Sequence, residues 1–231
     1  GLQRFDLLYG FPNPKATAVF KRVGYAPLGE LSRHARVLRH GAYVRRKLPG
    51  ALAAPAGALL DAVDRMRLWS RSGGPRAQWQ ASADATLAAV WSPASAGAGP
   101  LAVRDLEFLR WRIDASPLQA ARYLVVRDRG GLPVAWFACE TRELSLHVVD
   151  FWSSPGVAGP TPAQLAALRR AARADGHPSV TIELSAAAAT VAWCQAGFAA
   201  REGRPVFGRA RDAQVDALKA QAWLTTADED E

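Results

Sequence analysis

Asp150 and His147 are the two side chains in this sequence whose type and position best suit proton transfer. Asp150 stands near the end of an apolar run, residues 144–151 (LSLHVVDF), which predicts a buried strand. A carboxylate at a strand end can act as a general base when its surroundings bring its pKa toward neutral pH. His147 lies three residues earlier, on the opposite face of a regular strand. We therefore take Asp150 as the candidate base, with helix capping or a surface ion pair as alternatives, and regard His147 as structural.

A second group of chemistry-bearing residues is the triplet Arg110, Trp111 and Arg112. Guanidinium groups bind anions, and an indole ring offers a large flat surface on which the apolar face of a sugar can stack. The triplet is therefore a candidate acceptor-binding platform. The alternative is that Trp111 anchors a helix while both arginines face solvent.

The composition describes an ordinary globular protein. Its 231 residues are 49% hydrophobic and 22% charged, which suits one or two domains. Cys139 and Cys194 lie in apolar runs without metal-ligand spacing, so we expect two buried thiols and no metal site. No apolar run approaches the ~20 residues that span a bilayer, and no secretory signal is present. A cytoplasmic location is expected, although a Gly at position 1 leaves an upstream segment open.

The net charge of +8 is concentrated at the N-terminal end. Residues 1–76 hold 14 basic and 4 acidic side chains. A patch of this kind can bind an anionic partner, or it can be a solvated arginine-rich surface. We expect no nucleic-acid partner, because no base-reading module is recognisable. The sequence leaves the oligomeric state open.

Apolar periodicity and turn residues predict a mixed α/β arrangement. The expected strands are residues 3–9, 25–40, 77–81, 121–127, 133–140, 144–151, 179–185 and 205–209. The expected helices are residues 14–23, 58–69, 84–92, 104–113, 161–174, 187–196 and 212–231, the last with a frayed acidic tail. Strands precede crossover helices in the second half, so part of the sheet is expected to be parallel.

The first 36 residues recur near the end of the chain, as residues 176–211. Each copy reads strand, turn, helix, Gly–aromatic pair, strand, and Leu7 aligns with Ile182, Phe20 with Trp193. Chance similarity between two common units is the alternative to a repeat.

These patterns divide the chain into four parts. The second copy closes a complete domain over residues 77–211. The first copy has no preceding strands with which to pair, so we expect residues 1–48 to be the remnant of an earlier, truncated domain. Residues 49–76 would be a helical linker, and residues 212–231 a C-terminal helix with an acidic tail.

The segment from Asn13 to Tyr25 (NPKATAVFKRVGY) resembles a hallmark of the Gcn5-related N-acetyltransferase (GNAT) superfamily. In that hallmark an Asn, an Ala three residues later and a Tyr four residues further on precede a Gly–aromatic pair, which Gly24 begins here. The GFPN sequence at residues 10–13 and the FLRWR sequence at residues 108–112 are similar to bacterial two-domain acetyltransferases associated with polysaccharide synthesis. The resemblance covers residues 1–40 and roughly 77–211, and implies a GNAT-like mixed sheet flanked by helices.

The resemblance also implies acetyl-CoA as acyl donor and a set of residues around it. The sheet would splay after its central strand, where the pantetheine arm pairs with exposed backbone, and Asn13 and Phe20 would flank the thioester. Phe20 stands where the family has the Tyr that protonates the leaving thiolate. The pyrophosphate loop would be formed by Ser153, Gly156 and Ala158, with Ser153 in the place of a Gln or Arg.

Together these expectations describe an acyl-CoA-dependent acetyltransferase. It would move an acetyl group to an amine or hydroxyl of a small-molecule or glycan acceptor, such as a sugar precursor. The alternative is a degenerate, non-catalytic GNAT domain that binds an acceptor or a partner.

Overall fold

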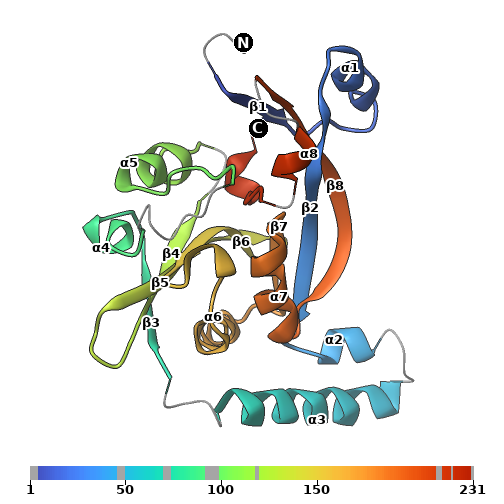
Figure 1. Ribbon diagram of the computed structural model, residues 1–231. Coiled ribbons are helices and arrows are strands. Elements are labelled where there is room, and N and C mark those ends of the chain that lie inside the picture. The colour runs from blue at the N-terminus through green and yellow to red at the C-terminus, as the bar shows by residue number, and fades with distance from the viewer. Residues whose placement is uncertain are drawn as a thin grey trace.

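The computed structural model describes residues 5–45, 50–69, 74–91, 99–117, 120–211, 215–219 and 221–229 (Figure 1). They form one eight-stranded sheet in the order β1-β8-β2-β7-β6-β5-β4-β3. Neighbouring strands are antiparallel except for β6 and β7, which are parallel. The strands are β1 (Leu7–Gly10), β2 (Ala26–Val37), β3 (Arg76–Gln80), β4 (Arg122–Arg127), β5 (Pro133–Arg142), β6 (Ser145–Ser153), β7 (Ser179–Leu184) and β8 (Ala199–Ala210). The predicted mixed α/β fold with a partly parallel sheet is confirmed.

The helices are short apart from α3 and α6. They are α1 (Thr17–Arg22), α2 (Gly41–Val44), α3 (Gly50–Trp69), α4 (Ala85–Ala88), α5 (Leu106–Leu109), the π-helix η2 (Arg110–Asp114), the 3-10 helix η3 (Gly156–Ala158), α6 (Pro162–Ala174), α7 (Ala187–Gln195), α8 (Val215–Leu218) and the 3-10 helix η4 (Thr226–Asp228). None of the helices in the described part of the chain combines the length and the apolar character needed to cross a membrane.

Helices cover both faces of the sheet. Trp136 and Phe137 are neighbours on β5, so their side chains point to opposite faces. The ring of Phe137 packs edge-on against Trp193 of α7. The ring of Trp136 packs against Tyr123, whose hydroxyl donates to the carbonyl oxygen of Leu109 in α5. Thus α7 lies on one face and α5 on the other, with a shared apolar core between them.

The described part of the N-terminal unit, residues 5–45, shares this sheet with the rest of the chain through β1 and β2 (Figure 1). Strand β1 pairs with β8, and β2 lies between β7 and β8. The expectation that this unit lacks partner strands considered only the residues before it, whereas its partners lie more than 140 residues further along the chain. That premise is wrong, while the division into four domains stays a prediction.

Helix α3 begins at Gly50, eight residues before the predicted start, and runs through Pro55. It is held against the sheet by Asp64, whose Oδ1 accepts from Arg36 at 2.7 Å and from Arg169 at 2.8 Å. Arg36, one of the basic residues near the N-terminus, is thus used inside the fold and is not part of a free cationic surface.

The C-terminal residues depart most from expectation. A helix over residues 212–231 is wrong: within the described part, α8 spans four residues and an extended stretch then leads into η4. Trp223 and Leu224 are buried, because their apolar side chains dock on the sheet. Cys139 is a buried thiol as expected, whereas Cys194 is exposed, because it lies on the outer side of α7.

Candidate functional site

Strands β6 and β7 run together for only a short distance. Their parallel pairing joins Leu146, His147 and Val148 to Val180, Thr181 and Ile182. Strand β6 then continues to Ser153 and β7 to Leu184, without further pairing between them in the described chain. The sheet therefore opens at the carboxyl ends of its two parallel strands, a place where α/β sheets commonly bind ligands.

A β-bulge in β6 decides which side chains face this opening. Cys139 of β5 lies opposite Val148, and Ala138 lies opposite Asp150, so Val149 is an extra residue. An extra residue reverses the alternation beyond it. Asp150 consequently faces the same side as His147, and the expectation that they lie on opposite faces is wrong.

Asp150 lies in a buried ion cluster with Arg104 and Asp228. Arg104 Nε lies 3.1 and 3.0 Å from the two carboxylate oxygens of Asp150, and Arg104 Nη2 lies 2.8 Å from Asp228 Oδ2. Thr225 Oγ1 donates to Asp150 at 2.8 Å. One guanidinium thus faces two carboxylates away from water, so the cluster carries an excess negative charge.

Burial sets the protonation of both candidate acid–base groups. Loss of solvent raises the pKa of Asp150 to about 6; the charge of Asp228 adds to this, and Arg104 opposes it. Burial lowers the pKa of His147 to about 3, helped by nearby Arg142, Arg33 and Arg204. A neutral His147 bonds Thr181 Oγ1 at 2.9 Å and Thr226 Oγ1 at 3.1 Å, as expected of a structural histidine.

Residues 222–229, which we call the C-terminal segment, lie beside the opening between β6 and β7. Thr225 forms an antiparallel bridge with Leu184, the last residue of β7. Ser185 N donates to Leu224 O at 3.0 Å, and Ser185 Oγ donates to Ala222 O at 2.9 Å. The segment therefore hydrogen-bonds to the backbone at the end of β7, where β7 is no longer paired with β6.

Trp223 fills the remaining space on the other side of the segment. Its ring lies 5.0 Å from Phe151 and 5.3 Å from Trp152, centroid to centroid. The guanidinium of Arg104 sits 4.4 Å from the same ring. Trp223 N donates to Pro100 O at 2.9 Å, which ties the segment to the loop before α5. The C-terminal segment is thus built into the opening from both sides.

The sequence did not identify Arg104, Thr225 or Asp228 as part of this site. One local signal was present: Thr225 and Asp228 have the spacing of a capping box, and Thr225 N donates to Asp228 Oδ2 at 2.8 Å. Read alone, that signal predicts a helix start in an acidic tail. Only the docking of Trp223 shows that the tail is buried.

Ser153, Gly156 and Ala158, the predicted pyrophosphate loop, lie at the last residue of β6 and in the turn that follows it. Gly156 and Ala158 bound the turn η3, and Gly156 has a φ of 65°. Ser153 Oγ is buried and has no partner among the described residues. Beside it, the backbone at Gly159 is so close to α7 that an added Cβ would lie 2.9 Å from Ala189 Cα.

The N-terminus of α6 is occupied by its own side chains. Thr161 N donates to Gln164 Oε1 at 2.7 Å, and Gln164 N donates to Thr161 Oγ1 at 3.3 Å. Pro162 at the first helical position has no N–H. Two of the donors that could hold phosphate at this helix N-terminus are therefore used by the capping box, and Pro162 supplies none.

Asn13 and Phe20 lie in a different part of the molecule. Asn13 is exposed, and its Oδ1 accepts from Ala16 N at 2.9 Å, which caps the first turn before α1. Phe20 packs against Tyr25, with ring centroids 5.0 Å apart. Figure 1 shows α1 at the top of the view and α6, which follows the loop after β6, in its lower half, so these residues and that loop do not form one site within this chain.

The triplet on η2 is split between surface and interior. Arg110 is exposed, and Trp111 is 68% exposed. Arg112 turns inward, where Nε donates to Ala227 O at 2.6 Å and Nη2 donates to Glu229 O. Neither the acceptor-binding platform nor the helix anchored by its tryptophan fully describes the triplet. The tryptophan does not anchor the helix, and one arginine binds the C-terminal segment.

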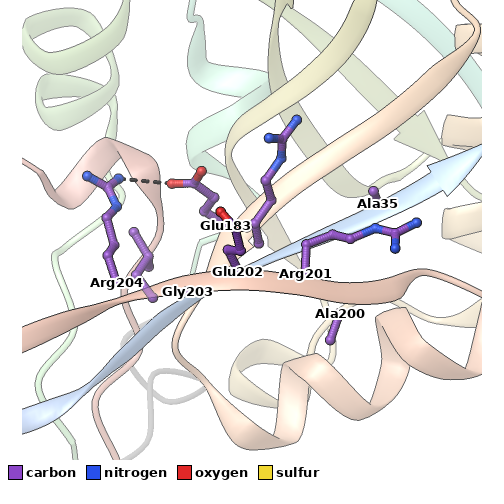
Figure 2. Close-up of a pocket in the computed structure, with 9 residues that line it drawn as sticks. Ala35, Glu183, Ala200, Arg201, Glu202, Gly203 and Arg204 are labelled. Atoms are coloured by element: carbon purple, nitrogen blue, oxygen red, sulfur yellow. Dashed lines mark hydrogen bonds and ion pairs between the residues drawn. The ribbon is translucent and has the colours of Figure 1, made fainter.

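An open depression of about 740 Å³ lies on the sheet face beside the segment, lined by residues of β2, β7 and β8. Figure 2 shows Arg204 turned toward Glu183 and Arg201 directed away from both. Arg204 bonds Glu183 at 2.9 Å and also pairs with Glu229 of the C-terminal segment. The depression and the opening are thus connected through the end of the segment. The described residues hold no group of His, Cys, Asp and Glu arranged for a metal ion.

Known structures share this architecture. The chain superposes on a GCN5-related N-acetyltransferase from Anabaena variabilis with a TM-score of 0.55 and 10% identity, over 90% of this chain and 46% of that one. A GCN5-related N-acetyltransferase from Kribbella flavida gives a TM-score of 0.52 and 14% identity, over 93% and 45%. A conserved protein of unknown function from Enterococcus faecalis gives 0.54 and 10%, over 90% and 46%.

These likenesses show that the chain has the GNAT fold. The chain spans less than half the length of each of these three proteins. A comparison of the sequence with protein-family models and with curated proteins finds no match.

Proposed function

We propose that this chain is an acyl-CoA-dependent acetyltransferase in a closed state. Its acceptor would be an amine or hydroxyl, of the sugar or glycan-precursor class that the sequence resemblance implies. The observation that carries the proposal is the position of Asp150. In a protein with the GNAT fold, the bulge at Val149 turns this carboxylate toward the opening of the sheet.

Acetyl-CoA does not fit the closed arrangement. The C-terminal segment lies against Leu184 and Asp150, where the resemblance places the pantetheine arm. The helix that would receive the pyrophosphate is capped by Thr161 and Gln164. Ser153 Oγ is the one feature of the loop that favours a ligand, since it is buried without a partner among the described residues.

In this proposal Asp150 takes the proton from the acceptor after the C-terminal segment withdraws. Burial raises its pKa to about 6 in the closed state, and withdrawal of the segment with Asp228 would lower it, which leaves the carboxylate ionised and able to accept a proton at neutral pH. An Asp150→Asn variant should therefore lose turnover while it keeps its affinity for acetyl-CoA. Unchanged turnover would exclude Asp150 as the base.

Release of the C-terminal segment gives the sharpest test of the closed state. Arg112 clamps the segment through the carbonyls of Ala227 and Glu229, and a charged hydrogen bond contributes about 1.5–3 kcal/mol. We expect Arg112→Gln to raise the affinity for acetyl-CoA about tenfold in calorimetry, because more molecules are open. Arg110→Gln is the matched control, since Arg110 is exposed on the same π-helix and should leave affinity unchanged.

A second candidate function is a non-catalytic domain that binds an acceptor or a partner. The self-capped α6 N-terminus and the contact between Gly159 and Ala189 favour it, because both fill space that phosphates would need. If neither the natural chain nor Arg112→Gln binds acetyl-CoA at millimolar concentration, this second function replaces the first.

A further inference from the structure

The two strand–helix–strand units of this chain meet at an internal two-fold axis. The first unit is β1, α1 and β2, and the second is β7, α7 and β8. Strands β2 and β8 run antiparallel to one another, with Leu31 opposite Arg204. The first strand of each unit pairs with the last strand of the other: β1 with β8, and β7 with β2.

The pairing of β2 with β8 has the self-consistency that a two-fold axis requires. Ala26 lies opposite Gly208, and Ala35 lies opposite Ala199. When the units are aligned at their Gly–aromatic pairs, Ala26 is equivalent to Ala199, and Ala35 to Gly208. A two-fold rotation that exchanges the two units therefore places the pair Ala26–Gly208 on the pair Ala199–Ala35, as in an isologous interface. The sequence repeat is thus a structural repeat.

The two units differ in what lies on their outer edges. The outer edge of β7 is covered by β6, which runs parallel to it from Leu146 to Val148. The outer edge of β1 ends the sheet, and no described strand pairs with it. An unpaired edge presents free N–H and C=O groups to any strand that can reach it.

The helices of the two units also differ in how much of their surface is buried. Helix α7 buries Ala189 and Trp193 completely. The equivalent positions of α1 are Ala16 and Phe20, which are only partly covered, and α1 has no buried residue. The exposed large apolar residues around β1 and α1 are Phe5, Tyr9, Val19 and Val23. A helix in the position that α6 holds beside α7 is what this unit lacks.

We infer that the free edge of β1 binds a parallel strand, and α1 a covering helix, from a second GNAT-like half that precedes residue 1 in the natural polypeptide. A strand–helix unit like β6–α6 is the occupant that restores the two-fold arrangement. A second copy of this chain cannot supply it, because β6 is already paired with β5 and β7 on its two edges.

The internal symmetry also fixes the register of the incoming strand. Ala210 pairs with Leu7, and its equivalent Val37 pairs with Ser179, so Leu7 corresponds to Ser179. This differs by three residues from the sequence alignment, which places Leu7 opposite Ile182. Residues 8–10 are then equivalent to residues 180–182, and should receive the strand.

The surface beside β1 suits such a strand. A groove of about 240 Å³ follows the strand and is lined by Leu7, Leu8, Tyr9, Gly10, Phe11 and Asp228. The lining is mainly apolar and backbone, which favours β-strand addition over binding of a charged ligand.

Amide hydrogen exchange can test this inference. The 231-residue chain is compared with the longer polypeptide that includes the residues encoded before Gly1. We expect the amides of β1 that point away from β8 to exchange at least tenfold more slowly in the longer protein, whereas the alternate amides, which face β8, should change less. Strand β3 is the internal control, since it forms the other edge of the same sheet and should exchange equally in both.

A variant on α1 checks that the protection comes from the proposed contact. Val19→Asp should restore fast exchange of β1 in the longer protein, because Val19 is 56% exposed here and would be covered there. Val191→Asp on α7 is the matched control, at 54% exposure, and should leave exchange unchanged. Equal exchange of β1 in both proteins would overturn the inference. So would protection of β1 by self-association of the 231-residue chain.

Discussion

The guanidinium of Arg104 faces the carboxylate of Asp150 inside the protein, with Nε 3.1 and 3.0 Å from the two oxygens and neither side chain exposed to solvent. The same guanidinium also bonds Asp228 in the C-terminal segment. Arg104 therefore holds a strand of the sheet and the end of the chain together. Arg104 thus holds the closed state together with Arg112 and Arg204, which also bind the C-terminal segment.

Removal of Arg104 should be strongly destabilising. Arg104→Met leaves two carboxylates buried without a counter-charge, and loss of one partner from a buried ion pair costs about 3–5 kcal/mol. Urea denaturation would measure the change in the free energy of unfolding. Replacement of Asp150 and Asp228 by Asn in the same variant should recover part of the loss. A loss below about 1 kcal/mol for Arg104→Met alone would contradict the cluster.

The pH dependence of stability should report the raised pKa of Asp150. Between pH 4 and 6 the folded protein holds a proton on Asp150 that the unfolded chain has released, so its contribution to stability falls as pH rises. Asp150→Asn lacks this titration. The difference in unfolding free energy, natural protein minus variant, should therefore decrease by up to about 3 kcal/mol from pH 4 to pH 7. A difference that increases with pH would show that the folded pKa is lowered instead.

Trp223 should be an anchor of the C-terminal segment. Trp223→Ala leaves a cavity beside Phe151 and Trp152, and such truncations cost about 3–5 kcal/mol. Thermal unfolding would show a lowered midpoint. Trp111→Ala is the control, because that ring is on the surface and its loss should change stability by less than about 0.5 kcal/mol. Equal effects of the two changes would mean that the segment is not docked.

Gly159 should tolerate no side chain. It has a φ of 85°, and an added Cβ would lie 2.9 Å from Ala189 Cα, so Gly159→Ala meets both backbone strain and a backbone clash. Gly131→Ala is the control, because its φ of 87° gives the same strain with nothing within 4 Å. We expect a loss of about 1 kcal/mol for Gly131→Ala and clearly more for Gly159→Ala. Calorimetric unfolding of both variants would compare them, and equal losses would show that α7 does not press on this loop.

Local sequence patterns were sufficient for most of the strands and helices. Thr161 followed by Pro162 predicts the start of a helix, and α6 begins at Pro162 with Thr161 as its N-cap and both capping-box hydrogen bonds present. Gly24 was expected to end a helix, and it has the positive φ of 87° that such an end requires. These signals depend on a few neighbouring residues, so they can be recognised without knowledge of the rest of the chain.

The candidate site was predicted only in part. The position of Asp150 near the end of a strand is a local property and was predicted correctly. Its direction is not local, because the extra residue Val149 is defined only by the pairing of β6 with β5. The partners Arg104 and Asp228 come from segments 46 residues before and 78 residues after it, and no short-range pattern connects them.

The sequence by itself determined the α/β class, the strand–helix order and the internal repeat, because apolar periodicity, caps and turns are written in neighbouring residues. Only the tertiary structure decided that β2 lies between β7 and β8, that Leu31 meets Arg204 at a two-fold axis, and that the acidic tail is buried. Strand pairing and burial are set by contacts between distant segments. From the sequence alone, a charged residue such as Asp228 is expected to face solvent. In the structure it is buried, because its ion pair with the distant Arg104 compensates for the loss of hydration.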